Sequence, residues 1–443
     1  MFLSRDEAEA LTKRILALST ADACRVWLNG REFHNLRLAS RGGGSNASGG
    51  YPNAVVQAQF GLRRGRAKAY AFDDASLRAA VADAEAAAKA APENPETQPP
   101  AKSIAYPPSA AYFDATVALD APSLADAVAP AAAAARASGL DFALFAYSNR
   151  HWRAYATSAG AFGYDRATRV GFKTTMRNKR GTWSSWAGGN EHDVKRLDAA
   201  ALARSAAEKA AATPDHAALE PGKYVALLEP AVTAQFVETM TWGFGAREAD
   251  EGRSWFSAQG GGNRIGQKLF DERVTLVSNP AHADAPCLAL SADGQANNPV
   301  TWIEAGVLKN LTRPLFWARK MKAPLVAEAD FFAMRGGTDA TADMIRDVKR
   351  GVLVTRLWYV RTLDWRKLLF TGLTRDGTFL IENGKVTRPV SNFCFNESPA
   401  AVLSNILAMG PSKRAMLAEN DTALSVPTLL VKDFTFSSVS PAV

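Results

Sequence analysis

The apolar positions along the first 92 residues predict a mixture of helices and antiparallel strands. Ser4 stands three residues before Glu7 in a capping-box pattern, and apolar side chains follow at positions 11, 15 and 18, so a helix of about 15 residues is expected. Asp73 or Asp74 caps a second helix that runs toward Pro92. Between the two helices, four stretches alternate apolar and polar residues as half-buried strands do: 23–29, 33–40, 54–60 and 66–72.

A glycine-rich and a proline-rich segment interrupt this pattern. Residues 41–50 read RGGGSNASGG, and such a run of glycine and small polar residues predicts a mobile loop. Prolines recur through residues 92–109 and predict an extended linker, because proline removes a helix donor and fixes φ. Beyond the linker, the pattern predicts two helices and two strands: 123–138 and 197–212, and 141–147 and 169–177.

Short strands separated by turn residues dominate the C-terminal half. A strand at 224–228 opens it, and Asn383–Gly384 marks a hairpin within 380–390. A helix at 399–409 and a strand at 427–436 follow.

The length agrees with this organisation, since 443 residues at about 100–200 per domain predict two or three domains. The predicted fold class is α+β: an N-terminal α/β-mixed domain, residues 1–219, which contains the linker, and a mainly antiparallel β domain, residues 220–443. No apolar run approaches the roughly 18 residues of a membrane span. The first ten residues are rich in acids where a signal peptide needs an apolar stretch, so a cytoplasmic location without membrane contact is expected.

Cysteine and histidine are scarce and dispersed. The 3 cysteines contain no CxxC motif and the 5 histidines no HExxH or HxH motif, which excludes a disulfide framework and disfavours a metal site. The glycine-rich stretches 42–50 and 261–268 lack the spacing of a phosphate-binding loop. Glu191, His192 and Asp193 are adjacent, and adjacent side chains do not face one another, so a polar turn is expected there.

The net charge is +8, and part of the excess of basic residues lies in three clusters, at 63–68, 166–180 and 346–350. No nucleic-acid motif accompanies them, so solvated basic strands and loops are the expected role, and nucleic acid is not an expected partner. A basic groove also suits acidic or extended peptides. The 10 tryptophans, Trp186 among them, are expected mainly as core or interface anchors.

Several segments, taken in order, resemble the TldD/PmbA family of metallopeptidases and in particular its TldE (PmbA) branch. The resemblance spans nearly the whole chain. It rests on residues 69–89, 219–230 (LEPGKYVALLEP), 266–280, 293–294, 303–309, 348–355, 381–390 (IENGKVTRPV) and 426–436.

The resemblance implies where a zinc site belongs. The catalytic TldD subunit carries HExxxH on the helix after the equivalent of residues 219–230; its histidines and a later cysteine bind Zn²⁺, and its glutamate acts as general base. Here Glu238 is retained, but Val237 and Trp242 stand in place of the histidines and cannot ligate zinc. The cysteine has no counterpart either, because Cys394 lies too early.

The missing ligands imply a non-catalytic TldE-like subunit with a degenerate active-site helix near 230–243. The implied partner is a TldD-like chain that holds the zinc and with this chain forms a heterodimer that cleaves unfolded or short peptides; no cofactor is expected in this chain itself. Trp242, Arg247, Arg253 and Trp255 are the predicted peptide- or partner-binding residues. Simple packing of the helix against the sheet is the structural alternative.

Two other functions stay open at this point. A stand-alone homodimer of the same fold would bind peptides or act as a scaffold. A hydrolase with a rebuilt, non-zinc site would use Glu238 with His192 or His282.

Overall fold

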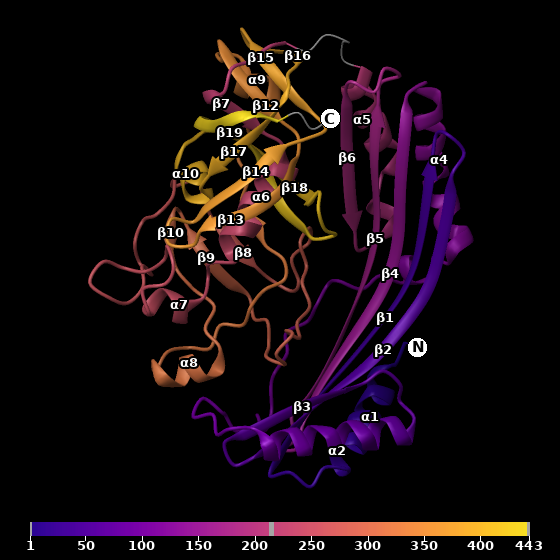
Figure 1. Cartoon of the computed structure of the whole chain (residues 1–443), viewed down its shortest axis with the longest axis vertical. Helices are drawn as coiled ribbons and strands as arrows, with labels where there is room; N and C mark the ends of the chain where they lie inside the picture. The colour runs from indigo at the N-terminus through magenta and orange to yellow at the C-terminus, as the bar shows by residue number, and fades with distance from the viewer. Residues whose placement is uncertain (1, 212–216, 441–443) are drawn as a thin grey trace.

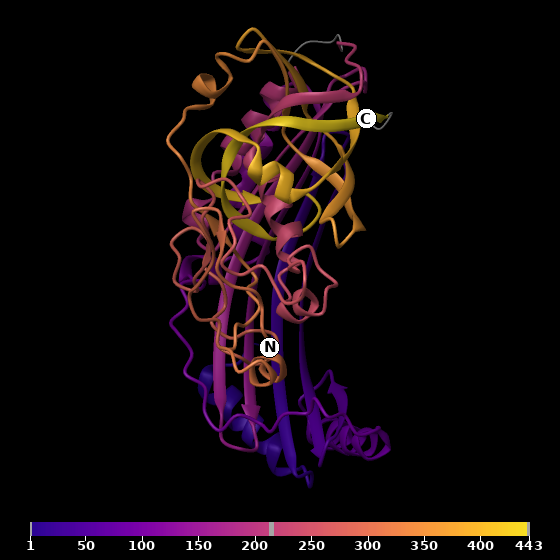
Figure 2. The same ribbon diagram turned by 90° about the vertical axis from the view of Figure 1, so that its left-hand side faces the viewer.

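The computed structural model describes residues 2–211 and 217–440. Within these residues, the N-terminal part builds one sheet and the C-terminal part a second, larger one, which confirms the α+β class. Figure 1 shows the long N-terminal strands side by side along one flank and the C-terminal sheet stacked beside their upper part. In Figure 2 the N-terminal strands run behind the C-terminal part and extend below it.

The N-terminal sheet is antiparallel, in the order β3-β2-β1-β4-β5-β6. Its strands are β1 (Ala23–Ala39), β2 (Gly44–Phe60), β3 (Arg63–Ala69), β4 (Asp141–Thr157), β5 (Phe162–Arg177) and β6 (Ser184–Glu191). The strands predicted at 23–29 and 33–40 are therefore one strand. Gly30 does not break it, because Trp152 of β4 occupies the space of the missing side chain, 2.3 Å from an ideal Cβ.

The loop predicted at 41–50 is wrong, because β2 begins at Gly44. Backbone pairing with β1 runs through this segment, for example between Leu38 and Gly44 and between Phe33 and Gly49. Strand hydrogen bonds need no side chain, so the neighbouring strand overrides the weak propensity of glycine. Since β3 covers only Ala54–Phe60 of β2, the first half of β2 is an exposed sheet edge.

Helices cover one face of this sheet at both ends. Helices α1 (Arg5–Ala17) and α2 (Asp74–Ala90) pack on the end near β3, and α4 (Ala121–Ala137) and α5 (Ala199–Ala211) on the other. The capping box of Ser4 and the cap at Asp73 are both present, as predicted. Between α2 and α4 the only element described is α3 (Asp114–Val117). Ala212, the predicted end of the helix at 197–212, lies outside the described residues.

The C-terminal sheet is built around β19 (Ala423–Ser440), and helix α6 (Pro230–Thr241) packs against it. Neighbouring strands run mostly antiparallel to β19. The other strands are β7 (Gly222–Leu228), β8 (Leu276–Ser278), β9 (Val300–Glu304), β10 (Val307–Leu308), β11 (Ala333–Met334), β12 (Arg350–Val354), β13 (Leu357–Asp364), β14 (Leu369–Thr374), β15 (Thr378–Glu382), β16 (Lys385–Pro389), β17 (Asn392–Glu397) and β18 (Ile406–Met416). The short helices are η1 (Val194–Arg196), α7 (Ala246–Asp250), α8 (Leu315–Lys320), α9 (Thr341–Ile345) and α10 (Pro399–Ser404).

Local turn signals in this half predicted the structure well. The hairpin of β15 and β16 turns at Asn383–Gly384, both with positive φ (49° and 76°), as predicted. The helix expected at 399–409 ends at Ser404, because residues from Ile406 onward pair with β19. No helix in the described residues is both long and apolar enough to cross a membrane.

Candidate functional site

Helix α6, for which the sequence predicts a degenerate active-site motif, is almost entirely buried. Its Val237 is fully enclosed in the C-terminal core, whereas Trp242 is the C-cap and is 50% exposed. The two side chains that stand in place of the family's histidines therefore do not converge. Neither the hydrocarbon side chain of Val237 nor the indole N–H of Trp242 offers a lone pair to a metal. The side chains at these two positions therefore do not fit a zinc ion.

Glu238 is the polar residue that remains of the motif. Its Oε2 accepts a hydrogen bond from Gln235 Nε2 (3.2 Å) and its Oε1 one from Asn420 Nδ2 (3.3 Å). Burial raises the pKa of the Glu238 carboxyl, and the nearby Glu419 carboxylate raises it further. The side chain is therefore held by two amides rather than by a cation or a base.

The two histidines considered for a rebuilt site have other partners. His192 donates from Nδ1 to the carbonyl oxygen of Thr168 at 2.6 Å. His282 Nδ1 accepts hydrogen bonds from the backbone N–H groups of Asp284 and Ala285, both at 3.1 Å. Neither imidazole is hydrogen-bonded to Glu238. No three His, Cys, Asp or Glu side chains form a metal-binding group within residues 2–211 and 217–440.

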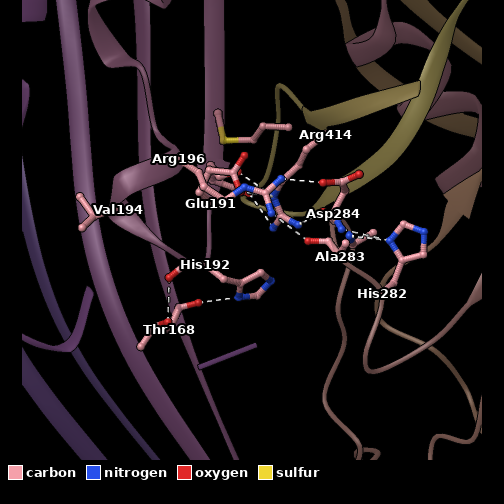
Figure 3. A network of polar contacts seen from close by, with 12 residues as sticks. Thr168, Glu191, His192, Val194, Arg196, His282, Ala283, Asp284 and Arg414 are labelled. Atoms are coloured by element: carbon pink, nitrogen blue, oxygen red, sulfur yellow. Dashed lines mark hydrogen bonds and ion pairs between the residues drawn. The ribbon is translucent and has the colours of Figure 1, made fainter. Parts of the chain in front are cut away.

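Glu191 ends β6 and His192 and Asp193 form a bend, at a place where Arg414 of the C-terminal part contacts the N-terminal sheet (Figure 3). Arg414 of β18 reaches across to Asn190 O at 2.7 Å, and its Nε lies 3.8 Å from a Glu191 carboxylate oxygen. The same guanidinium donates to Asp284 O at 2.6 Å, in the loop between β8 and β9. The polar turn predicted here therefore has a structural role: it fixes the position of the C-terminal part on β6.

A cavity of about 780 Å³ lies between the two sheets. Strands β1, β2, β4, β5 and β6 form one wall, and residues around β13 and the segment before β19 form the other. The polar and aromatic side chains that line it are Arg37, Phe145, Lys173, Trp186, Arg356, Trp358 and Glu419.

Arg356 anchors the C-terminal wall of this cavity. Its guanidinium lies between the rings of Trp186 (5.2 Å) and Trp358 (4.8 Å) and is ion-paired with Asp376. Ser184 of β6 donates a hydrogen bond to the same carboxylate at 2.6 Å, so the pair also ties the wall to the N-terminal sheet. Burial lowers the pKa of Arg356, whereas the carboxylate of Asp376 raises it. The guanidinium stays cationic.

Three cations line the cavity, which adjoins α6. Arg37, Lys173 and Arg356 accompany one lining carboxylate, Glu419, while Arg356 is ion-paired with Asp376 and Lys173 with Asp421. The residue after Glu419 is Asn420, whose amide holds Glu238. The wall of the cavity and α6 are thus joined through one short segment.

Of the predicted binding residues, the structure brings Trp242 and Arg253 together. Both line a separate cavity of about 250 Å³, with Glu248 and Trp365. Arg253 is ion-paired with Glu251 (2.6 Å), so its charge is already engaged.

Arg247 and Trp255 lie elsewhere. Arg247 makes a two-point ion pair with Glu96 of the proline-rich segment, at 2.8 and 3.0 Å. Trp255 packs edge-on against Phe256, with Arg264 over its ring at 4.4 Å. The four residues do not line one pocket.

The sequence did not predict that the residues of the larger cavity form a site. Arg356 lies just before β13, Trp358 lies on it and Glu419 lies in a loop, but no spacing links them to Trp186 on β6. The one local pattern in the cavity wall that could have indicated a binding surface is the tryptophan among small residues in the SSWAGG stretch of β6.

Two family models match the chain. The PmbA/TldA metallopeptidase central domain matches residues 70–213, and the C-terminal domain of the same family matches residues 221–438. Together these matches cover most of the sequence, and the chain belongs to the PmbA/TldD family of metallopeptidases. A search of curated proteins found no match.

Solved structures share the fold over nearly the full length. TldE from Thermococcus kodakarensis is 14% identical with a TM-score of 0.82, over 96% of this chain and 99% of that one. A protein from Thermotoga maritima, described as a modulator of DNA gyrase, gives the same four values. A protein from Bacteroides thetaiotaomicron with a similar description is 16% identical with a TM-score of 0.79, over 99% of this chain and 100% of that one.

Proposed function

We propose that this chain is the non-catalytic, TldE-like subunit of a cytoplasmic, heterodimeric TldD/TldE-type zinc metalloprotease that processes unfolded or short peptides. The zinc ion and the hydrolytic step belong to the TldD-like partner. The observation that supports the proposal is that α6, where the sequence resemblance places the family's catalytic helix, presents Val237 to the core and Trp242 to the surface.

The cavity between the sheets supports a role in holding peptide. Its volume of about 780 Å³ suits a short extended segment. Gly44 and Ser45, which begin the free edge of β2, line its rim. A free edge pairs with an extended peptide through backbone hydrogen bonds regardless of sequence, while Trp186, Trp358 and the surrounding cations contact side chains.

The experiment that tests the proposal is co-expression with a TldD-like chain that bears HExxxH. We expect a 1:1 complex, zinc only in the partner, and peptide hydrolysis only when both chains are present. Trp358→Ala in the cavity should raise KM for an unfolded peptide by about tenfold, the cost of losing one buried aromatic contact. Tyr359→Ala removes an exposed aromatic side chain at the adjacent position, which lines none of the cavities described; it is the matched control and should leave KM unchanged.

Three outcomes contradict the proposal. Stoichiometric zinc with hydrolysis by the isolated chain would make it a catalyst, and loss of that activity in Glu238→Gln would identify a rebuilt site. A stable homodimer that ignores the HExxxH chain would favour the scaffold function. Equal KM changes in Trp358→Ala and Tyr359→Ala would show that the cavity does not bind the peptide.

A further inference from the structure

The basic cluster at 63–68 is divided between the two faces of the N-terminal sheet, with Arg64 and Arg66 on one face and Arg63 on the other. In β3, Gly65 points to α2, where an ideal Cβ would lie 2.2 Å from Ala88 N, so Arg64 and Arg66 lie on the opposite face. Arg66 pairs across with Gln57, and Gln57 with Arg25. Positions 25, 57 and 66 therefore form a row across three strands, on the face that α1 and α2 leave uncovered.

This row forms one wall of a cavity of about 270 Å³. Trp27 and Tyr155, with ring centroids 5.1 Å apart, line the cavity on the same side. Phe316 and Trp317 of α8 close it from the C-terminal part. Figure 1 shows α8 near the end of the sheet that carries β3. The cavity is thus a second contact region between the two parts of the molecule, remote from α6.

The arginines of this wall have neutral partners only. Arg25 donates to Gln59 Oε1 at 3.0 Å and Arg66 to Gln57 Oε1 at 2.7 Å. Within residues 2–211 and 217–440, no carboxylate lies at ion-pair distance from Arg25, Arg64 or Arg66. Burial lowers the pKa of Arg25 and of Arg66, and the charge of Arg64 lowers both further. Three like charges therefore converge without compensation.

The acids around the cavity do not neutralise this charge. Glu96 is already paired with Arg247, at 2.8 Å. Asp293, the other carboxylate of the lining, accepts hydrogen bonds from Ser291 and from the backbone N–H of Gln295. Three guanidinium groups against this one carboxylate leave the cavity with a net charge of about +2.

A buried donor in the same wall also lacks an acceptor. The indole Nε1 of Trp27 is enclosed and has no hydrogen-bond partner among the described residues. A buried N–H without an acceptor costs free energy. The nitrogen itself is not exposed to the open space of the cavity, but Arg66 lies over the ring of the same tryptophan at 4.8 Å, so the aromatic ring and the cation occupy one side of the cavity.

We propose that this cavity binds a small dianionic phosphate group, held by Arg25, Arg64 and Arg66. Guanidinium groups recognise phosphate oxygens through paired N–H donors. A charge of about +2 matches a phosphate dianion better than a single carboxylate. The small volume fits a phosphate or a compact phosphate ester rather than a polymer. Because α8 closes the cavity, the bound anion also links the C-terminal part to the N-terminal sheet.

The test is a calorimetric titration of the full chain with inorganic phosphate, at constant ionic strength set by chloride, and a parallel titration with acetate. We expect saturable phosphate binding and a weaker or absent response to acetate. Arg64→Gln should weaken phosphate binding about tenfold or more, the loss of one charge-assisted contact. Arg64 holds no other described side chain, so this variant should keep the stability of the wild type in urea.

The matched control is Arg63→Gln. It removes the same charge from the adjacent residue, which belongs to the opposite face of β3, and should leave phosphate affinity within twofold of the wild type. Absence of saturable phosphate binding, equal losses in the two variants, or acetate binding as tight as phosphate would each overturn the proposal. The titration uses neither a partner chain nor a peptide, so its result is independent of the proposed function.

Discussion

At the scale of single residues, His192 makes the stability of the protein sensitive to pH. Burial is the main reason that the pKa of the imidazole lies well below 6.5. The charges of Arg414 on β18 and Arg169 on β5 lower it further, and His151 of β4 adds a smaller effect. Its Nε2 is buried without a hydrogen-bond partner among the described residues. A second proton would therefore place a charge among cations with no acceptor, and the folded ring stays neutral.

We expect the free energy of unfolding to fall as the pH drops below about 6.5. In that range the unfolded chain takes up a proton at His192 that the folded chain does not, which costs about 1.4 kcal/mol per pH unit. His192→Gln should reduce this slope between pH 6.5 and 5 in urea titrations, and His151, whose pKa burial also lowers, to about 3, should account for a part that remains. Above pH 7.5 the two proteins should show parallel pH dependence, which is the control. Equal slopes below pH 6.5 would show that His192 does not drive the effect.

The motif residues that sequence reasoning proposed lie on a single element. Val237 and Glu238 belong to α6 and Trp242 is its C-cap, so the spacing of one motif was enough to propose all three. It did not show their orientation, because burial of Val237 and exposure of Trp242 depend on which face of α6 the sheet covers. Trp186 and Arg356 come from different sheets and meet only through the packing of the two parts of the chain, which no local pattern encodes.

At the scale of elements, the sequence predicted helix caps and turns correctly but missed a strand that is formed by pairing with a distant segment. The capping box at Ser4 and the turn at Asn383–Gly384 depend on residues within four positions of each other, and both were predicted. The first half of β2 was missed because its strand conformation comes from β1, through hydrogen bonds that a glycine makes as well as any residue.

The turn of the β15–β16 hairpin should be intolerant of a side chain. Gly384 has φ 76°, and an ideal Cβ there would lie 2.5 Å from the carbonyl oxygen of Arg346. Gly384→Ala combines backbone strain with a clash against main chain and should destabilise the protein by about 1–3 kcal/mol. Gly43→Ala is the control, since an ideal Cβ at Gly43 meets nothing within 4 Å. Urea denaturation of both variants measures the difference, and similar losses would contradict the argument.

At the scale of the whole molecule, a few buried charged groups couple the two sheets. Arg414 joins β18 to β6, and Asp376 joins Arg356 to Ser184. Arg247 joins α7 to the proline-rich segment through Glu96. Each contact spans segments far apart in the sequence, so the two parts should unfold together as long as these contacts are intact.

Removal of Arg414 should uncouple the two parts. Its side chain is 4% exposed, burial lowers its pKa to about 10, and its loss leaves the Asn190 and Asp284 carbonyls without their donor. We expect Arg414→Met to lower the free energy of unfolding by about 3 kcal/mol and to split a single calorimetric transition into two. Lys413→Met removes the same charge from the adjacent, exposed position and should leave one transition. A single, unshifted transition in Arg414→Met would show that apolar contacts alone hold the sheets together.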